Sequence, residues 1–169
     1  MRYISPRKIL LLIALLAIVA VAYSLFAQVY QRYEPCPLCI VQRVLIAVIG
    51  ILSLIFAIHF PKNWLIRVYG AIITLLSLFC LKVALHHDWL LSLPKDQQPM
   101  SCGAPLGFLY KHLPLNEFID TVMKGDASCS QVVWKVAGVS APIAVTVFCI
   151  ILAILSLLVV FTCYPKKTS

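Results

Sequence analysis

Long apolar stretches alternate with short polar segments along this chain of 169 residues. Asp, Glu, Lys and Arg are absent from residues 9–31, 44–61 and 136–165. A fourth gap, residues 68–81, becomes long enough for a span if Lys82 extends its ammonium group to the membrane surface. Since a helix that crosses a bilayer needs about 20 apolar residues, the pattern predicts four transmembrane helices, at about residues 9–29, 40–59, 64–85 and 142–161.

Composition agrees with this pattern, because 62% of the residues are hydrophobic and 12% are charged. Soluble domains average about 45–50% apolar and about 25% charged residues. We therefore predict an all-α membrane protein: a single membrane domain over residues 1–169, folded as a four-helix transmembrane bundle. A cleavable signal peptide is the alternative for the N-terminus. It is disfavoured because the apolar run continues to Val29, beyond the usual apolar region of about 7–15 residues.

The basic residues predict the orientation of the bundle. Both tails and the turn between the second and third spans carry cations and no acids; these cations are Arg2, Arg7, Lys8, Lys62, Arg67, Lys166 and Lys167. Because cytoplasmic segments of membrane proteins are enriched in Lys and Arg, we expect cytoplasmic termini and outer loops at about residues 30–39 and 86–141. The net charge of +8 is then a topology signal, and we expect no nucleic-acid partner.

The second outer loop contains one segment with helical periodicity. Its apolar residues are Leu115, Phe118, Ile119, Val122 and Met123, spaced as on one face of a helix. This predicts a short amphipathic helix that lies on the membrane lipid. Packing on a core within the loop is the alternative, which we disfavour because so short a segment can hardly build a core.

The strongest chemical signal is Cys36-Pro37-Leu38-Cys39, at the start of the second span. This spacing is typical of thiol–disulfide oxidoreductases. We expect Cys39 at a helix N-terminus, where the helix dipole favours a thiolate, and Arg43 one turn later on the same side. Ile40 stands where haem attachment needs histidine. A zinc site built from cysteines of both loops is a further alternative, but no second close ligand pair is present and we expect no metal.

Cys102 and Cys129 lie in the second outer loop, on the same predicted side as the CxxC. They form either a structural disulfide or a second redox pair that exchanges with the first. Cys80, Cys149 and Cys163 are interpreted as small buried apolar residues.

His86 and His87 close the third span. Either could hydrogen-bond a quinone carbonyl, or both could be interfacial residues without a ligand.

Taken together, these features resemble the bacterial disulfide bond formation protein B (DsbB) family. The resemblance covers nearly the whole chain and rests on four spans, the CxxC, the arginine four residues after it, and the distant cysteine pair. It implies a four-helix thiol–quinone oxidoreductase of the bacterial inner membrane with its active site facing the periplasm. The implied cofactor is ubiquinone or menaquinone from the membrane pool, and the implied partner is a periplasmic DsbA-like protein of thioredoxin fold.

The resemblance also implies residue roles. Cys102 and Cys129 would oxidise the DsbA-like partner, and Cys36 and Cys39 would be the quinone-linked pair. Arg43 matches the arginine of the family's quinone site.

His87 matches a histidine near the quinone. The resting disulfides are left open, including a rearranged link such as Cys36–Cys129.

Two other functions compete with this reading. The first is a non-catalytic four-span scaffold with structural disulfides in its outer loops, although a CxxC ring adds little stability by loop closure. The second is an importer of reductant, which would need cysteines within the spans, such as Cys80 and Cys149, to reach each other.

Overall fold

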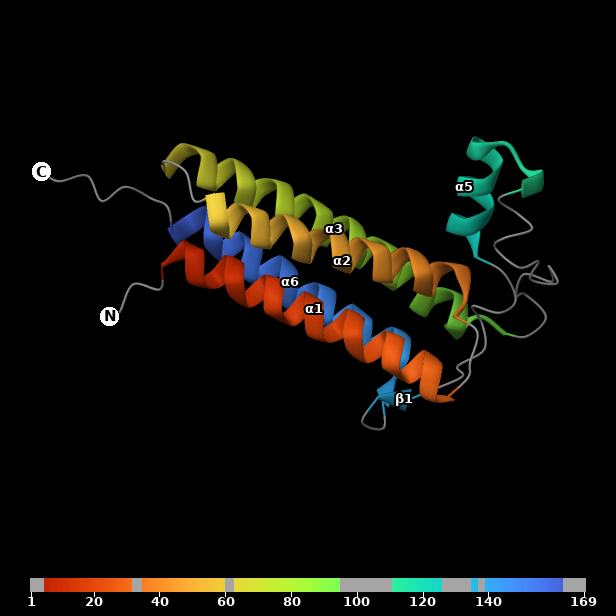
Figure 1. The fold of residues 1–169 in the computed structure, drawn as a ribbon. Coiled ribbons are helices and arrows are strands. Elements are labelled where there is room, and N and C mark those ends of the chain that lie inside the picture. Colours follow the sequence, from red (N-terminus) through yellow and green to blue (C-terminus); the bar gives the residue numbers. More distant parts are fainter. Residues whose placement is uncertain are drawn as a thin grey trace, which may run out of the picture.

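The computed structural model describes residues 5–31, 35–59, 63–94, 111–125, 135–136 and 139–162. Within them, four long helices form a bundle (Figure 1). All four are long and apolar enough to cross a membrane, so the predicted all-α four-helix bundle is confirmed. The helices are α1 (Pro6–Gln31), α2 (Pro37–His59), α3 (Asn63–Ser92) and α6 (Ala141–Thr162).

Contacts between the long helices close a ring in which α1 contacts α2 and α6, and α3 contacts α2 and α6. The start of α1 and the end of α6 lie at one end of the bundle, and the start of α2 lies at the other (Figure 1). Successive long helices therefore run in opposite directions, as the short connections between α1 and α2 and between α2 and α3 require. Which end faces the cytoplasm stays a prediction from the basic residues.

The bundle buries aliphatic side chains inside and exposes others around its outside. Leu10, Ile13, Ile49, Ile73 and Leu152 are fully buried in one continuous core. The outward faces of all four helices carry large exposed apolar side chains, including Leu15, Ile51, Leu75 and Ile154. This apolar outer surface, the apolar girdle, suits contact with lipid tails, because the tails are as apolar as the side chains that meet them.

Small residues set the closest helix approaches. At Gly50 on α2, an added Cβ would lie 2.7 Å from the Cβ of Ala17 on α1. At Gly70 on α3, an added Cβ would lie 2.9 Å from Cγ2 of Val160 on α6. Close backbone approach through small residues is a common way to pack helices inside a membrane.

Helix α3 continues to Ser92, well past Leu85, where the predicted third span ends. Residues 86–92 contain no Pro or Gly to stop the helix. Leu90 is buried with Val83, Cys36 and Leu38 in a second apolar cluster at this end of the bundle. This packing keeps His86 and His87 helical rather than in a loop, so their orientation is fixed.

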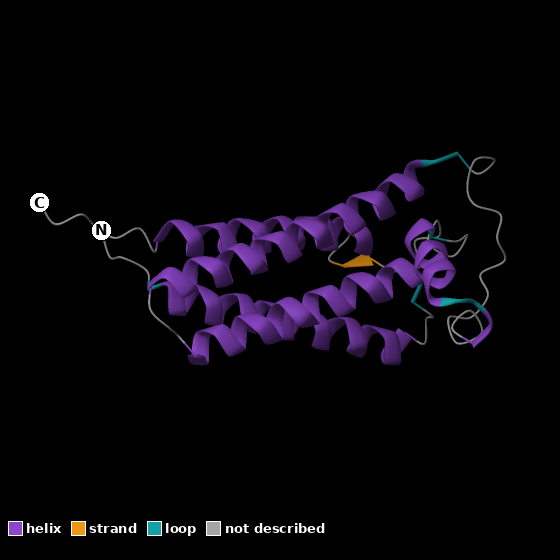
Figure 2. Ribbon diagram, turned by 90° about the horizontal axis from the view of Figure 1, so that it is seen from above, coloured by secondary structure: helices purple, strands orange, loops and turns teal. Residues whose placement is uncertain are grey.

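The second loop contributes a short helix, α5 (Leu115–Lys124), which lies across the end of the bundle where α2 begins (Figures 1 and 2). Pro114 is its N-cap, and Gly125, at φ 75°, ends it. Val122 is buried, and Met123 packs on the second apolar cluster. The predicted amphipathic helix is therefore present, and part of its apolar face contacts the bundle; its position on lipid stays a prediction.

A two-stranded antiparallel sheet precedes the last long helix. Strands β1 (Lys135–Val136) and β2 (Val139–Ser140) pair Lys135 with Ser140 and Val136 with Val139. The sequence pattern did not predict this hairpin, because two-residue strands are too short to show periodicity. Helix α6 follows β2 directly, so the hairpin defines where the last span begins.

Candidate redox site

Cys36 and Cys39 lie at the first turn of α2, because Pro37 is the first helical residue. Proline suits this position, where its missing N–H has no partner to lose. Cys36 therefore occupies the N-cap, and its Sγ accepts a hydrogen bond from the Cys39 backbone N–H at 3.3 Å. The two sulfurs are 2.8 Å apart.

The sequence predicted that the helix N-terminus stabilises a thiolate at Cys39. In the structure, the backbone N–H of Cys39 donates a hydrogen bond to the Cys36 sulfur. A side-chain acceptor at the N-cap satisfies one of the four N–H groups that a helix leaves without partners. Negative charge on the Cys36 sulfur is thus favoured by a directed hydrogen bond and by the helix dipole. Cys39 remains half-buried and faces the space between α1, α2 and α6.

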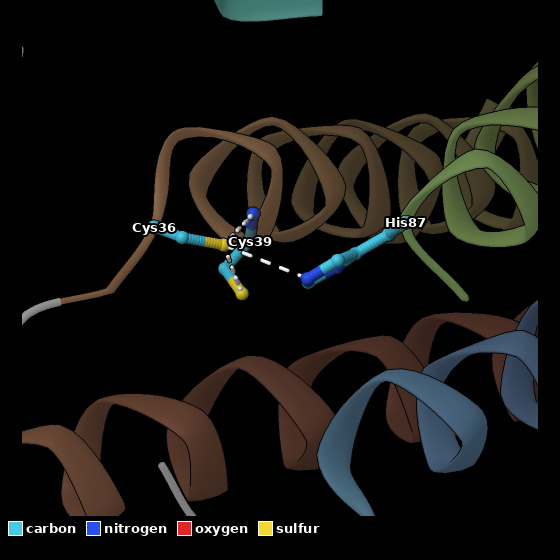
Figure 3. A group of neighbouring side chains, drawn as sticks. All are labelled: Cys36, Cys39 and His87. Carbon is cyan, nitrogen blue, oxygen red and sulfur yellow. Dashed lines mark hydrogen bonds between the residues drawn. The ribbon is translucent and has the colours of Figure 1, made fainter. Parts of the chain in front are cut away.

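His87 approaches the same sulfur from α3. Its Nε2 lies 3.8 Å from Cys36 Sγ, although 51 residues separate the two in sequence (Figure 3). His87 is 2% exposed, whereas the ring of His86 stacks on Trp89. The residues alone did not distinguish these two histidines, although the family resemblance pointed to His87 near the quinone, and the structure places His87 beside Cys36 of the CxxC.

Arg43 is held by α1. Its Nη1 donates to Gln28 Oε1 at 2.6 Å, and its Nη2 donates to the backbone oxygen of Ser24 at 3.5 Å. Both partners lie within the first apolar stretch, so Arg43 is anchored between α1 and α2 rather than extended toward water. A fixed guanidinium within a membrane-spanning segment is a mark of a functional site.

Cys39 and Arg43 line one cavity of about 230 Å³ between α1, α2 and α6. The predicted placement of these two side chains on the same side of the helix agrees with this finding. Val145 and Phe148 of α6 contribute apolar walls. His87 is not among the described residues that line the cavity, so it lies beside Cys36 rather than in the cavity wall.

Gln42 also lines the cavity and was missed by the sequence analysis. It is 3% exposed, and its Nε2 has no hydrogen-bond partner among the described residues. An unpartnered buried amide costs about 1–3 kcal/mol, which a ligand with an oxygen acceptor would recover. A search for amides as well as charges in the apolar stretches would have found Gln42.

Cys102 and Cys129 fall outside the residues that the structure describes. Their pairing, and their exchange with Cys36 and Cys39, therefore stay predictions.

A sequence profile described as "Disulfide bond formation protein DsbB" matches residues 6–159. This chain belongs to the DsbB family. Among its relatives is a disulfide bond formation protein B of Chromobacterium violaceum, 39% identical over 86% of this chain and 87% of the relative. Proteins of the same name from Nitrosococcus oceani and Acinetobacter baylyi are 35% and 40% identical, over 91% and 78% of this chain and 90% and 77% of the relatives.

Membership in the DsbB family, with four spanning helices, makes this chain a multi-pass membrane protein. Its role is that of an oxidoreductase in disulfide bond formation. This role favours the catalytic reading of the CxxC over the scaffold alternative, in which the cysteines never exchange.

Proposed function

We propose that this DsbB-family protein oxidises a periplasmic DsbA-like dithiol protein and passes the electrons to a membrane quinone. The observation that carries the proposal is that Cys39 and Arg43 line the same cavity inside the bundle. A thiol and a fixed cation are thereby presented together to a molecule that enters from the lipid phase. The enzyme class is protein dithiol:quinone oxidoreductase, and the quinone is ubiquinone or menaquinone.

The residues present fit a quinone ring. The cavity of about 230 Å³ is smaller than the usual small-molecule pocket of about 300–1,000 Å³, so it suits one ring with its tail left outside. Arg43 and the Gln42 amide supply hydrogen-bond donors for quinone oxygens, and Phe148 supplies an apolar wall. When bound, the quinone accepts two electrons and two protons.

The chain's cysteines carry the electron pair toward this cavity. A thiolate of the partner attacks the Cys102–Cys129 disulfide, and the partner leaves as a disulfide once both outer cysteines are reduced. An outer thiolate then attacks Cys36, and Cys39 becomes the leaving thiolate. A second outer thiolate releases Cys36 and re-forms Cys102–Cys129.

Local contacts favour this division of work between the two inner cysteines. Cys39 faces the cavity beside Arg43, whose charge stabilises the leaving thiolate. Cys36 lies beside the His87 imidazole, and its sulfur accepts a hydrogen bond from the Cys39 backbone N–H. The Cys36 sulfur can therefore become an anion or take up a proton as exchange proceeds. His87 thereby acts on the CxxC rather than on the quinone.

The proposed location is the bacterial inner membrane, with this end of the bundle facing the periplasm. The basic tails and the basic turn support the orientation, because such segments are retained on the cytoplasmic side. The exposed apolar girdle supports contact with membrane lipid. An oxidising periplasm is also the compartment in which exported proteins acquire disulfides.

The test is to follow a soluble quinone analogue by absorbance while purified protein is supplied with a reduced thioredoxin-fold dithiol protein. We expect quinone reduction to match the loss of partner thiols, and Cys36→Ala and Cys39→Ala to abolish both. Arg43→Ala should raise the quinone concentration needed for half-maximal rate by at least tenfold. Arg67→Ala, on α3 toward the other end of the bundle, is the matched control and should leave that concentration unchanged.

Two outcomes would reject the proposal. If partner thiols stay reduced and no quinone is consumed by folded protein, the scaffold function is favoured instead. If Cys39→Ala reduces quinone as fast as the wild-type protein, the cavity beside α2 is not where electrons leave.

A further inference from the structure

Three potential metal-ligand atoms meet at the outer end of the bundle. Cys36 Sγ, Cys39 Sγ and His87 Nε2 all lie within 4.8 Å of one another. Figure 3 shows the His87 ring reaching from α3 toward the two sulfurs on the first turn of α2. Sequence spacing alone does not group these three ligands, since 51 residues separate His87 from Cys36.

We propose that the reduced Cys36–Cys39 pair and His87 form a binding site for a thiophilic divalent cation, Zn²⁺. Two thiolates and one imidazole are a known ligand set for zinc, with the fourth position left to water or another oxygen donor. Cysteines in C-x2-C spacing commonly bind one such ion together. Zinc sites with three protein ligands leave the fourth coordination position of the ion open, and the cavity beside Cys39 supplies the space for a ligand there.

The observed distances are near those that zinc requires. A tetrahedral ion at about 2.3 Å from sulfur and about 2.0–2.1 Å from nitrogen holds two sulfurs about 3.8 Å apart and sulfur and nitrogen about 3.6 Å apart. Cys36 Sγ and His87 Nε2 are already 3.8 Å apart. The two sulfurs, at 2.8 Å, must separate by about 1.0 Å. Cys39 is half-buried, so its side chain can make this movement.

Charge balance favours the ion when both thiols are reduced. Two thiolates close together, with Cys36 buried and Cys39 half-buried, are costly unless a cation neutralises them. Zn²⁺ with two thiolates and a neutral imidazole has no net charge. Arg43 opposes any added cation, but it is one helical turn from Cys39 and its guanidinium is held by Gln28 and Ser24 on α1.

Binding involves no electron transfer. The two thiols and Zn²⁺ give a zinc dithiolate and two released protons. Both electron pairs stay on the sulfurs, so Cys36 and Cys39 cannot close a disulfide until the ion leaves. The site therefore selects the reduced protein, and an occupied site would hold it in that state.

The test uses the full chain in detergent with Cys102→Ala and Cys129→Ala, so that the outer thiols do not bind metal. Zinc affinity is measured by competition with a chromophoric chelator, for protein reduced by a thiol-free reductant and for protein with the Cys36–Cys39 disulfide. We expect one Zn²⁺ per reduced chain, and no binding to the oxidised chain. Cobalt substituted for zinc should show the intense sulfur-to-metal absorption of two thiolate ligands.

Matched histidine variants separate this site from other thiols. His87→Gln keeps a buried polar side chain of similar size and should weaken zinc binding by at least tenfold, since removing even an indirect partner of a metal site costs 10- to 100-fold. His86→Gln should change the affinity by less than twofold. Cys36→Ala should abolish the cobalt absorption, which excludes the buried Cys80–Cys149 pair as its source.

Equal zinc affinity in His87→Gln and the parent protein would overturn the proposal, as would unchanged cobalt absorption in Cys36→Ala. The Arg43→Ala variant distinguishes the proposed zinc site from the proposed quinone site. It should weaken quinone binding and should not weaken zinc binding, because it removes a nearby positive charge. Zinc binding that fails while quinone turnover proceeds would reject the metal site alone.

Discussion

Arg43 on α2 donates a hydrogen bond from Nη1 to Gln28 Oε1 on α1, with 2.6 Å between the two atoms. This contact joins residues 15 positions apart and fixes the only described guanidinium that lines the cavity between α1, α2 and α6. Hydrogen bonds to a charged group contribute about 1.5–3 kcal/mol. Gln28 is therefore a positioning residue for Arg43, reached from the neighbouring helix.

Replacing Gln28 tests this relationship. Gln28→Ala frees Arg43 to choose other rotamers, and we expect a three- to tenfold weaker quinone affinity with the cysteines still able to exchange. Gln28→Glu keeps an oxygen acceptor and should preserve the position of Arg43. Quinone titration of both variants, with thiol trapping as the readout of exchange, checks the prediction. Equal quinone affinity in the Ala variant would show that Ser24 alone is sufficient.

Cys80 and Cys149 form a second sulfur contact deep in the bundle. Their Sγ atoms are 2.9 Å apart across α3 and α6, and both residues are fully buried. The interpretation of Cys80 and Cys149 as buried residues is confirmed, and their contact is the one that the reductant-import alternative required. Cys80 lies seven residues before His87 on the same helix, which is about 10 Å along its axis.

We expect this contact to leave little room for a larger side chain. Cys149→Leu should destabilise the bundle by about 1–3 kcal/mol, because extra methyl groups in a close-packed core force side chains out of their rotamers. Ile150→Leu is the matched control on the same helix, at an exposed position where volume is unconstrained. Reversible unfolding in mixed detergent measures both, and equal stability would contradict the tight packing.

Gly50 provides a test of the close approach of α1 and α2. Gly50→Ala would place a Cβ 2.7 Å from the Cβ of Ala17, a contact that only backbone movement relieves. We expect a loss of about 1–3 kcal/mol, against the gain of about 1 kcal/mol that alanine brings to an unhindered helix position.

A compensating change makes the Gly50 prediction specific. Ala17→Gly removes the Cβ that the new methyl group meets, so the double variant should recover most of the stability lost in Gly50→Ala. The double-mutant cycle, measured by the same unfolding assay, gives the coupling between the two sites. Additive losses would show that the two positions do not clash.

Thr146 and Asp88 connect α6 to the extended end of α3. Thr146 Oγ1 donates to Asp88 Oδ2 at 2.6 Å, and Asp88 Oδ1 is buried with no hydrogen-bond partner among the described residues. Thr146→Val keeps the shape but removes the donor, and should cost about 1–3 kcal/mol by leaving the carboxylate less satisfied. Thr146→Ser retains the hydroxyl and should cost less than half as much, measured by unfolding in detergent.

Helix α5 offers a test of membrane contact by the second loop. Leu115 and Ile119 are 69% and 52% exposed, although Val122 on the same helix is 7% exposed. Asp120 and Lys124 form an ion pair on its polar side. If the exposed apolar residues rest on lipid, charges at Phe118 and Ile119 should slow turnover in proteoliposomes severalfold. Asn116→Asp is the control, and unchanged turnover with normal expression of the Phe118 and Ile119 variants would contradict lipid contact.

The sequence by itself determined the four long helices, the redox motif and the family. Length and apolar composition decide whether a helix suits a bilayer, and both are local properties that any window of the chain displays. The same holds for the CxxC, for Pro37 at the first position of α2, and for the placement of Arg43 one turn after Cys39. These features follow from helical periodicity without knowledge of the neighbouring helices.

Only the tertiary structure decided which side chains from different helices meet. It selected His87 over His86 as the neighbour of Cys36, joined Arg43 to Gln28, and gave Gln42 a place in the cavity wall. The rotation of each helix about its axis controls these contacts, and that rotation depends on packing against the other three helices. Helices that are hydrophobic all round carry little information about which face turns inward. The sequence pattern therefore could not supply the rotation of each helix.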